Sequence, residues 1–548
     1  MNALHSISPA PYQSSLKEKK NKLGFHSHSS YQATLREYLD SLDKNSPEKV
    51  WIKAHVQKLM AVYYTNLDPI QDMIASLYSP DKRGNPATKP FAIIRSMLLM
   101  LEFREISIEK WAERVRTEPI LAIFSGFGFS RPPCNSTYYK LLERLEDGPY
   151  QRKCAHRVLP SEMRRKRSKE RPPCRKPDKK QVKEKEPVPP PALEALAKEI
   201  RLRQREPLPG DLEKRLNEML MEVAIKPSAE KGLIGDIEKL TITGDGSTLP
   251  SGANRFGKPT CECHKQGDYK CDHKRIYSDP DAQWGWDNQV KGFVFGYRYD
   301  QLVCSEKGHD LPMYLSIDSA NAHEALMCMK MVERFQKQNQ TLLPGASIAE
   351  IGLDAIHDAN AFYHFLYDRK IQYAIPYAKT PAKCLTLGNL TVNSQGIPLC
   401  KAGLPMRCIG LNRQKKRAYC CPVKRPARRN KERVYVTYRE ECPLEALCQP
   451  GSILGPIVSI APETDPRVHP EIPRGSKEYR RLLDLRSGCE RSNSMKKQYY
   501  RLKYDKGRTM PYTFIKLALA SILEHVKVWV RKKYESVEDK DDLLSLFE

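Results

Sequence analysis

Residues 241–252 read TITGDGSTLPSG and place one carboxylate, Asp245, between two glycines. The run from Lys239 to Thr243 has the β-branched composition of a strand, which we expect to stop at Gly244. A turn alone would explain the Asp and the glycines, because both residue types are common in turns. The alternative is a metal ligand at a strand tip, where glycine lets a phosphate or a backbone segment come close.

Composition narrows the class of protein before any motif is considered. The chain has 548 residues, 40% of them hydrophobic, which is enough for packed cores in two to four domains. Lys and Arg total 92 against 66 acidic residues, so the formal net charge is +26. Such an excess indicates a polyanionic partner, most often nucleic acid, although charge that merely maintains solubility is the alternative.

Targeting and redox signals are also informative. No apolar segment follows the early basic residues, and the apolar run 93–101 is short and interrupted by Arg95, so we expect no membrane partner. Sixteen cysteines in a chain without a secretory signal favour thiols or metal sites over disulfides.

The pattern of residues divides the chain into segments of different character. The expected fold class is α/β, with a β-rich insertion in the mixed region and a helical N-terminal domain. The segments are a flexible N-terminus (1–45), a helical domain (46–150), a basic Pro-rich linker with helices (151–235), an α/β domain (236–377 and 471–537), a basic β-rich insertion (378–470) and an acidic tail (538–548).

A second strand also ends in an aspartate. The stretch IAEIGLD predicts a strand that stops at Asp354, and residues 321–324 (NAHE) read as a capping box that opens the preceding helix. Asp358 lies close by, but Asp354 holds the position at the end of the strand.

A third carboxylate lies on a late basic helix, KEYRRLLDLRSGCERSNSMKKQYYRL (477–502). On one continuous helix, side chains within about 40° of Arg486 share a narrow face. These side chains are Tyr479, Glu490, Asn493 and Lys497. A salt-bridged solvent face is the alternative, and Gly488 could interrupt the helix.

The order of the three acids is more specific than any one of them. Asp at one strand end, Asp at a second and Glu on a late helix is the arrangement of RNase H-like nucleases. Three such carboxylates can hold two divalent ions on one scissile phosphate, and oxygen ligands suit Mg²⁺ or Mn²⁺.

On these motifs the chain resembles the bacterial DDE insertion-sequence transposases of the hairpin-forming, cut-and-paste group. The resemblance covers residues 50–150 and 236–535 and rests on TGDGS (243–247), GLDAIHDANAFYHFLYDRKI (352–371) and RSGCERSNSMKKQYYRLKY (486–504). It implies an RNase H-like catalytic domain behind a helical DNA-binding domain, and a DNA transposase that cleaves and joins strands.

The resemblance also implies roles for individual residues. Asp245, Asp354 and Glu490 would be catalytic ligands of two Mg²⁺ or Mn²⁺ ions, and Arg486, Lys497, Asn493 and Tyr479 would contact DNA. The family motif Tyr-x2-Arg-x3-Glu-x6-Lys fits at its last three positions, whereas Leu483 replaces the tyrosine and Tyr479 is the substitute. Ile356 and His357 stand where the family has Gly-Tyr.

The same resemblance implies partners and a location. The partners would be double-stranded DNA, as terminal inverted repeats and as target, and a second copy of the chain in a homodimer. The protein would be cytoplasmic and nucleoid-associated in a prokaryote. The alternatives are an inactive or repurposed DNA-binding protein derived from a transposase, and a zinc-dependent nucleic-acid-binding module.

A cysteine-rich segment, CECHKQGDYKCDH (261–273), supplies soft ligands at close spacing. Zinc requires four ligands in a tetrahedron, and the neatest set is Cys261, Cys263, Cys271 and His273, with His264 as an alternate. A polar loop with reduced thiols is the other interpretation. We expect a structural zinc ion. A second group of cysteines at 400–448 has irregular spacing, and buried apolar thiols explain it equally well.

Overall fold

The computed structural model describes residues 25–548 with gaps. The gaps are 44, 80–88, 129–131, 152–157, 171–191, 204–210, 269–270, 272, 274, 379–384, 388–389, 394–396, 414–415, 430–431, 439–441, 443, 445–447, 449–454, 461–465 and 468. The first 24 residues, and the part of the expected linker at 171–191, therefore lie outside the described residues.

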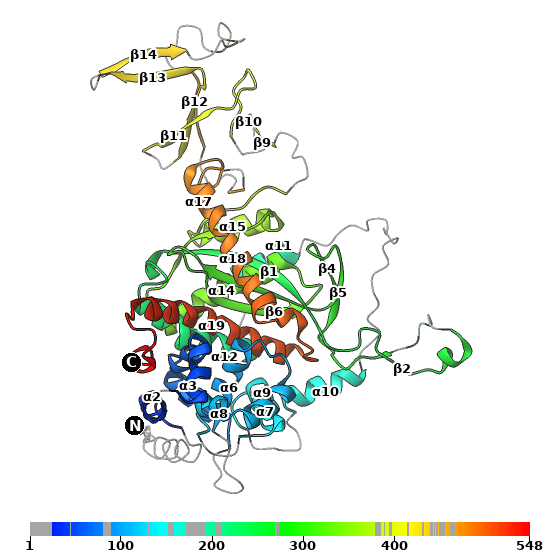
Figure 1. Ribbon diagram of the computed structural model, residues 1–548. Helices are drawn as coiled ribbons and strands as arrows, with labels where there is room; N and C mark the ends of the chain where they lie inside the picture. Colours follow the sequence, from blue (N-terminus) through cyan, green and yellow to red (C-terminus); the bar gives the residue numbers. More distant parts are fainter. Residues whose placement is uncertain are drawn as a thin grey trace, which may run out of the picture.

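A mixed β-sheet forms the centre of the fold (Figure 1). Strand β1 (Leu240–Pro250) pairs antiparallel with β5 (Gly292–Cys304), and β5 pairs antiparallel with β4 (Gln283–Asp287) and β6 (Leu311–Ser319). The other edge of β1 carries two parallel strands, β7 (Ile348–Gly352) and then β8 (Gln372–Ala374). The expected α/β class is confirmed.

Strand β1 is longer than the sequence indicates. It continues through the TGDGS motif to Pro250, and residues 243–250 pair with residues 296–303 of β5. The prediction of a strand that stops at Gly244 is therefore wrong, and Asp245 lies inside the strand. Local sequence misleads here because Gly and Asp are poor strand formers, whereas pairing along the whole of β5 keeps the segment extended.

The glycines beside Asp245 make room for side chains of the protein itself. A Cβ atom on Gly246 would overlap Asp300 Oδ1, and one on Gly244 would lie 2.7 Å from Leu353 Cδ2. Asp300 is the cross-strand partner of Gly246, so its carboxyl group folds over the missing side chain. The glycines thus make room for the side chains of Asp300 and Leu353.

We expect Gly246→Ala to destabilise the fold by about 1–3 kcal/mol, the usual cost of overpacking a filled interior. The measurement is the urea midpoint of unfolding. Gly292→Ala is the matched control, because only Val290 O lies within 4 Å of its added Cβ, at 3.6 Å. Adding Asp300→Ala should recover part of the loss, and a double variant with purely additive losses would contradict the clash.

Helices before the sheet cover one side of the molecule. Their order is α2 (His28–Asp40), α3 (Pro47–Ala54), α4 (Val56–Tyr63), α5 (Gln71–Ser76), α6 (Pro90–Glu102), α7 (Ile108–Thr117), α8 (Pro119–Ser125) and α9 (Asn135–Asp147). Several begin at a residue that suits a helix start: Ser27, Ser46 and Ser107 accept a backbone N–H, and Pro90 and Pro119 stand at first-turn positions.

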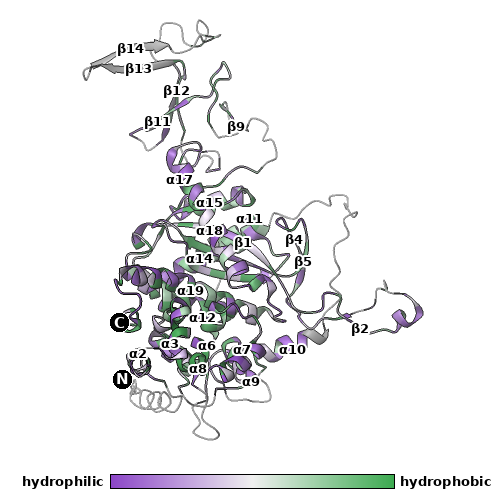
Figure 2. Cartoon of the chain, in the orientation of Figure 1, coloured by the Kyte–Doolittle hydropathy of each residue, from purple (hydrophilic) through white to green (hydrophobic). Residues whose placement is uncertain are grey.

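The long helix α19 (Met510–Ser536) joins these helices to the sheet. It packs against β6 and against α4, α6 and α9, and most of its residues are buried. Figure 2 shows apolar residues gathered where these elements meet. One continuous hydrophobic core therefore runs from the N-terminal helices into the sheet, and the expected helical domain has no core of its own.

The expected linker is structured over much of its length. Its helices are α10 (Pro160–Glu170), α11 (Ala192–Arg203), α12 (Asp211–Leu220), a π-helix (Met221–Ile225) and α13 (Lys226–Glu230). Helix α12 packs against α19 and β6 and buries Leu216, Met219 and Leu220. The helices expected in this segment are therefore present, and the apolar face of α12 holds it against the body of the protein.

The described parts of the two end segments, 25–45 and 538–548, contain short helices. Helix α2 lies within the expected flexible N-terminus and buries Tyr31, Leu35 and Leu39. Helix α20 (Leu543–Leu546) lies in the expected acidic tail, and Tyr64 Oη donates a hydrogen bond of 2.8 Å to Leu546 O. In each of these polar segments, the burial of a few apolar residues stabilises the helix.

Two segments project from the body (Figure 1). The insertion between β8 and the last helices is β-rich in its described part, as expected. Its strands are β9 (Leu385–Leu387), β10 (Leu390–Val392), β11 (Arg407–Leu411), β12 (Arg417–Cys420), β13 (Lys424–Arg429), β14 (Glu432–Tyr438) and β15 (Ile457–Ile460). The second segment is an arm between β1 and β4 that contains β2 (Lys258–Pro259) and β3 (Arg275–Ile276).

Among the described residues, none of the helices combines the length and the apolarity needed to cross a lipid bilayer.

A buried histidine on α19 makes the stability of the fold depend on pH. His525 is fully buried, with Nδ1 2.9 Å from Ser228 Oγ and Nε2 2.8 Å from Pro312 O. Ser228 Oγ accepts from Trp529 Nε1, so its own proton goes to Nδ1 and Nε2–H donates to the Pro312 carbonyl. Burial lowers the pKa of His525 to about 4, and the folded protein holds the neutral ring.

We expect stability to fall as pH decreases from 6.5 toward 4, because the unfolded chain takes up a proton on His525 first. The contribution of neutral His525 to the free energy of unfolding is fully present above pH 6.5, and about 3 kcal/mol of it is lost by pH 4. Urea unfolding at a series of pH values measures it. His525→Gln, which keeps polar atoms without titrating, should show a shallower slope, and equal slopes would contradict the assignment.

Candidate active site

Asp245 is held from the side of the late helix. Helix α18 (Ser487–Ser494) packs across β1 and β5, and Asn493 Nδ2 donates a hydrogen bond of 2.8 Å to Asp245 Oδ2. Burial raises the pKa of Asp245 to about 7, and the charges of Glu324, Asp354 and Glu490 act in the same direction against Arg486. The carboxyl group of Asp245 therefore lies near other acids, although Glu324 and Glu490 each form an ion pair, with Arg298 and Arg486.

Asp354 follows β7 and caps the short 3-10 helix η5 (Ala355–His357). Its Oδ1 accepts from the Ile356 amide at 3.1 Å and lies 2.8 Å from His357 Nδ1. Burial raises the pKa of Asp354, but these hydrogen bonds and the charge of His357 outweigh it and leave the pKa below its ordinary value. Asp354 thus favours its charged form, as a metal ligand must.

Glu490 lies on α18 and is solvent-exposed. Arg486 Nη2 lies 2.8 Å from Glu490 Oε1, and the charge of Arg486 also acts on Asp245 and Asp354. Although the three predicted acids are far apart in sequence, the charges of Asp354, Glu490 and Arg486 all act on Asp245. Among the described residues, Asp354 is the only one of the three that belongs to a group whose ligand atoms lie within 4.8 Å of one another. The Arg486–Glu490 salt bridge, which the sequence offered as the alternative to a functional role, is present and lies among these acids.

The late helix is not one regular helix. Helix α17 (Lys477–Leu485) and α18 meet at Arg486, and residues 495–499 form a π-helix. Lys497 is buried, and its Nζ donates to Ser247 Oγ at 2.9 Å and to Gln289 Oε1 at 3.0 Å. Lys497 therefore contacts β1 at Ser247, which is two residues after Asp245.

Tyr479 does not join the acidic group in the described contacts. It is buried at the start of α17 in a small apolar cluster with Ala374, Ile472 and Leu482. The single-helix geometry that placed it on the face of Arg486 does not describe this segment, because α17 ends at Leu485. Asp358, the alternative to Asp354, is also elsewhere: it forms a bidentate pair with Arg467 at 2.7 and 2.8 Å.

The structure adds residues that the sequence did not single out as functional. Ligand atoms of Glu324, Asp354 and His357 lie within 4.8 Å of one another and could hold a metal ion. Glu324 was assigned to a capping box, but α14 (Glu324–Leu342) starts after His323, whose side chain caps nothing, and Glu324 binds Arg298 instead. The sequence could have indicated His357 as a functional residue, because it follows Asp354 by three residues.

Asp300 is a further acid beside this group. It is fully buried, and both of its carboxylate oxygens lack a hydrogen-bond partner among the described residues. Burial and the charge of Glu324 raise the pKa of Asp300 well above its ordinary value, so the neutral form is favoured. Only the register of β1 and β5 places Asp300 opposite Gly246, and no local pattern reveals it.

The four predicted soft ligands come together in the arm. Cys261 Sγ lies 3.5 Å from Cys271 Sγ, and Cys263 Sγ lies 3.3 Å from His273 Nδ1. Ligand atoms of all four residues lie within 4.8 Å of one another, so the structure contains a candidate metal-binding group here. In the described part of the chain, the second set of cysteines (400–448) forms no such group.

No protein-family model matches this chain, and no curated protein matches it in sequence. Function is therefore inferred from the site geometry described above.

Proposed function

We propose that the protein is a DNA transposase that binds element ends and catalyses metal-dependent strand cleavage and strand transfer. The observation that carries the proposal is that the charges of Asp354, Glu490 and Arg486 all act on Asp245. The strand order β6-β5-β1-β7-β8, antiparallel up to β1 and parallel after it, supports an RNase H-like fold.

The donor set fits divalent cations. Asp245, Asp354 and Glu490 would hold two Mg²⁺ or Mn²⁺ ions, because carboxylate oxygens are the ligands these ions prefer. The raised pKa of Asp245 supports this, since its causes are burial and the charges of the neighbouring acids. Such ions, when bound, activate an oxygen nucleophile and stabilise the leaving oxygen of an in-line displacement.

Residues of the chain orient the ligands and the DNA. Asn493 fixes one oxygen of Asp245, and His357 and the Ile356 amide fix one oxygen of Asp354. Arg486 offers a guanidinium for phosphate binding beside Glu490. In the first displacement water attacks a phosphodiester, and its P–O3′ bond breaks to leave a 3′-hydroxyl and a 5′-phosphate. In the second, that 3′-hydroxyl attacks a target phosphodiester and loses its proton, the target P–O3′ bond breaks, and a target 3′-hydroxyl is released.

Partners follow from the same proposal. The net charge of +26 and the basic insertion suit the phosphate backbone of double-stranded DNA, as element ends and as target. Two copies of the chain would pair the two ends. We also propose that Cys261, Cys263, Cys271 and His273 bind a structural zinc ion: tetrahedral Zn–S bonds of about 2.3 Å separate the ligand atoms by roughly 3.5–3.8 Å, close to the observed spacing.

Incubation with supercoiled plasmid tests the proposed activity. The plasmid carries the DNA that flanks the coding region on both sides, and the products are resolved with Mg²⁺, with Mn²⁺ and with EDTA. We expect nicked and linear products only with a divalent ion, with breaks at the flanks. Binding without cleavage would favour the repurposed DNA-binding protein.

A further inference from the structure

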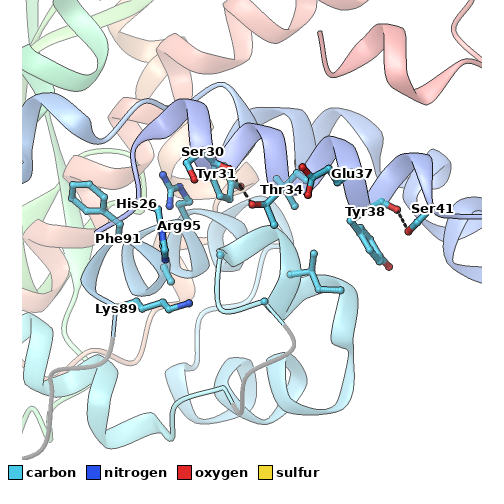
Figure 3. A pocket seen from close by; sticks show the side chains of 15 residues that line it. His26, Ser30, Tyr31, Thr34, Glu37, Tyr38, Ser41, Lys89, Phe91 and Arg95 are labelled. Carbon is cyan, nitrogen blue, oxygen red and sulfur yellow. Dashed lines mark hydrogen bonds between the residues drawn. The ribbon is translucent and has the colours of Figure 1, made fainter. Parts of the chain in front are cut away.

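A cavity of about 370 Å³ lies among the N-terminal helices, between α2, α6 and the end of α8 (Figure 3). His26, Lys89 and Arg95 gather at one end of it, next to Ser30. Glu37 and Tyr38 lie toward the other end. The cavity is therefore cationic at one end only.

Arg95 is the unusual residue of this cavity. It is 3% exposed, and its guanidinium lies 3.8 Å from the centre of the Tyr31 ring. Its Nε and Nη2 atoms have no hydrogen-bond partner among the described residues, and no described carboxylate forms an ion pair with it. Nη1 points toward Gly126, a residue of the cavity wall.

Several other buried cations of the described residues have partners for their polar hydrogens. Lys496 Nζ lies 2.6 Å from Glu524 and Lys516 Nζ lies 2.8 Å from Asp505, whereas Arg215 and Lys497 donate to carbonyl, hydroxyl or amide oxygens. Burying an unpaired charge costs several kcal/mol, and a ring face offsets only part of that cost. Arg95 has the Tyr31 ring and the charge of Asp68 near it, but its Nε and Nη2 atoms lack the hydrogen-bond partners that those cations have.

We propose that this cavity binds a terminal phosphate group carried by a ligand of about nucleotide size. Arg95 and Lys89 would supply two positive charges, with the Ser30 hydroxyl and His26 as hydrogen-bonding groups for phosphate oxygens. Leu35, Phe91 and Ile123 form apolar walls for the body of the ligand. The phosphates of an intact duplex cannot reach a guanidinium this buried, so the phosphate is a free end.

This site lies outside the acidic group of β1, β7 and α18, so the proposal does not depend on the transposase assignment. Two sources share the chemistry: a mononucleotide, and the 5′-phosphorylated end of a DNA strand. The probes are inorganic phosphate, dAMP, and one short oligonucleotide with either a 5′-phosphate or a 5′-hydroxyl. The full chain is used, with thermal unfolding and calorimetric titration as readouts.

We expect dAMP or the 5′-phosphorylated oligonucleotide to raise the Tm, and the 5′-hydroxyl form to do so less. Arg95→Met removes the unpaired charge, so its Tm without ligand should equal or exceed that of the wild type, and its binding should be weaker by roughly tenfold or more. Arg165→Met, at an exposed arginine of α10, is the matched control and should bind as the wild type does.

The outcomes separate the sources and can overturn the site. A shift with dAMP assigns the site to a mononucleotide, and a shift with the phosphorylated oligonucleotide alone assigns it to a DNA end. No shift with any probe, or full binding by Arg95→Met, overturns the proposal. If Arg95→Met does not fold, Lys89→Gln tests the site instead. Loss of the partly exposed charge of Lys89 must weaken binding of the phosphate probe, and unchanged binding would overturn the proposal.

Discussion

Asp245→Asn is expected to lower metal-dependent DNA cleavage by roughly 10³-fold or more, the usual scale for loss of an essential catalytic group. Asparagine keeps the size of the side chain and can still bond Asn493, but it removes the negative charge that a divalent ion requires. Removing that charge from among Glu324, Asp354 and Glu490 also relieves repulsion. The variant should therefore fold at least as stably as the wild type.

The measurement is the rate of plasmid nicking at several Mg²⁺ concentrations, with DNA binding followed separately. Asp484→Asn is the matched control, because Asp484 is an exposed aspartate on α17, the helix that precedes α18. We expect DNA affinity to be retained in both variants and cleavage to be lost only in Asp245→Asn. Equal nicking by the wild type and Asp245→Asn would refute the catalytic assignment.

Cys271→Ser is expected to remove zinc from the protein and to loosen the arm between β1 and β4. Three remaining ligands bind zinc far less tightly, and the hydroxyl of serine is a poor replacement for a thiolate. The wild type should contain about one zinc ion per chain. The arm has little apolar packing of its own, since Cys261, Cys263, Cys271 and His273 are all at least partly exposed.

Elemental analysis of purified protein measures the zinc content, and limited proteolysis reports the order of the arm. Cys134→Ser is the matched control, because Cys134 is an exposed cysteine outside the cluster. Cleavage within residues 258–276 should appear in Cys271→Ser and not in Cys134→Ser. A zinc content that is unchanged in Cys271→Ser would rule out the proposed ligand set.

The pattern of the sequence located the acids better than it located the elements that carry them. Asp245, Asp354 and Glu490 were chosen from their order along the chain, and in the structure the charges of Asp354 and Glu490 act on Asp245. The end of β1 was misplaced because strand length depends on a partner, and β5 pairs with β1 as far as Pro250. Tyr479 was expected to contact DNA, but it packs in an apolar cluster with Ala374, Ile472 and Leu482, which no local pattern reveals.

What the sequence alone determined is local: the α/β class from its periodicity, the basic charge, the soft ligands at 261–273 and the three acids. Such features depend on neighbours within a few residues, and their chemistry is fixed by residue type. Only the tertiary structure decided that Glu324 and His357 join Asp354, that Asp300 fills the space beside Gly246, and that Arg95 is buried with Nε and Nη2 lacking a hydrogen-bond partner among the described residues. Those facts depend on strand register and on packing between residues far apart in the chain, which no local pattern encodes.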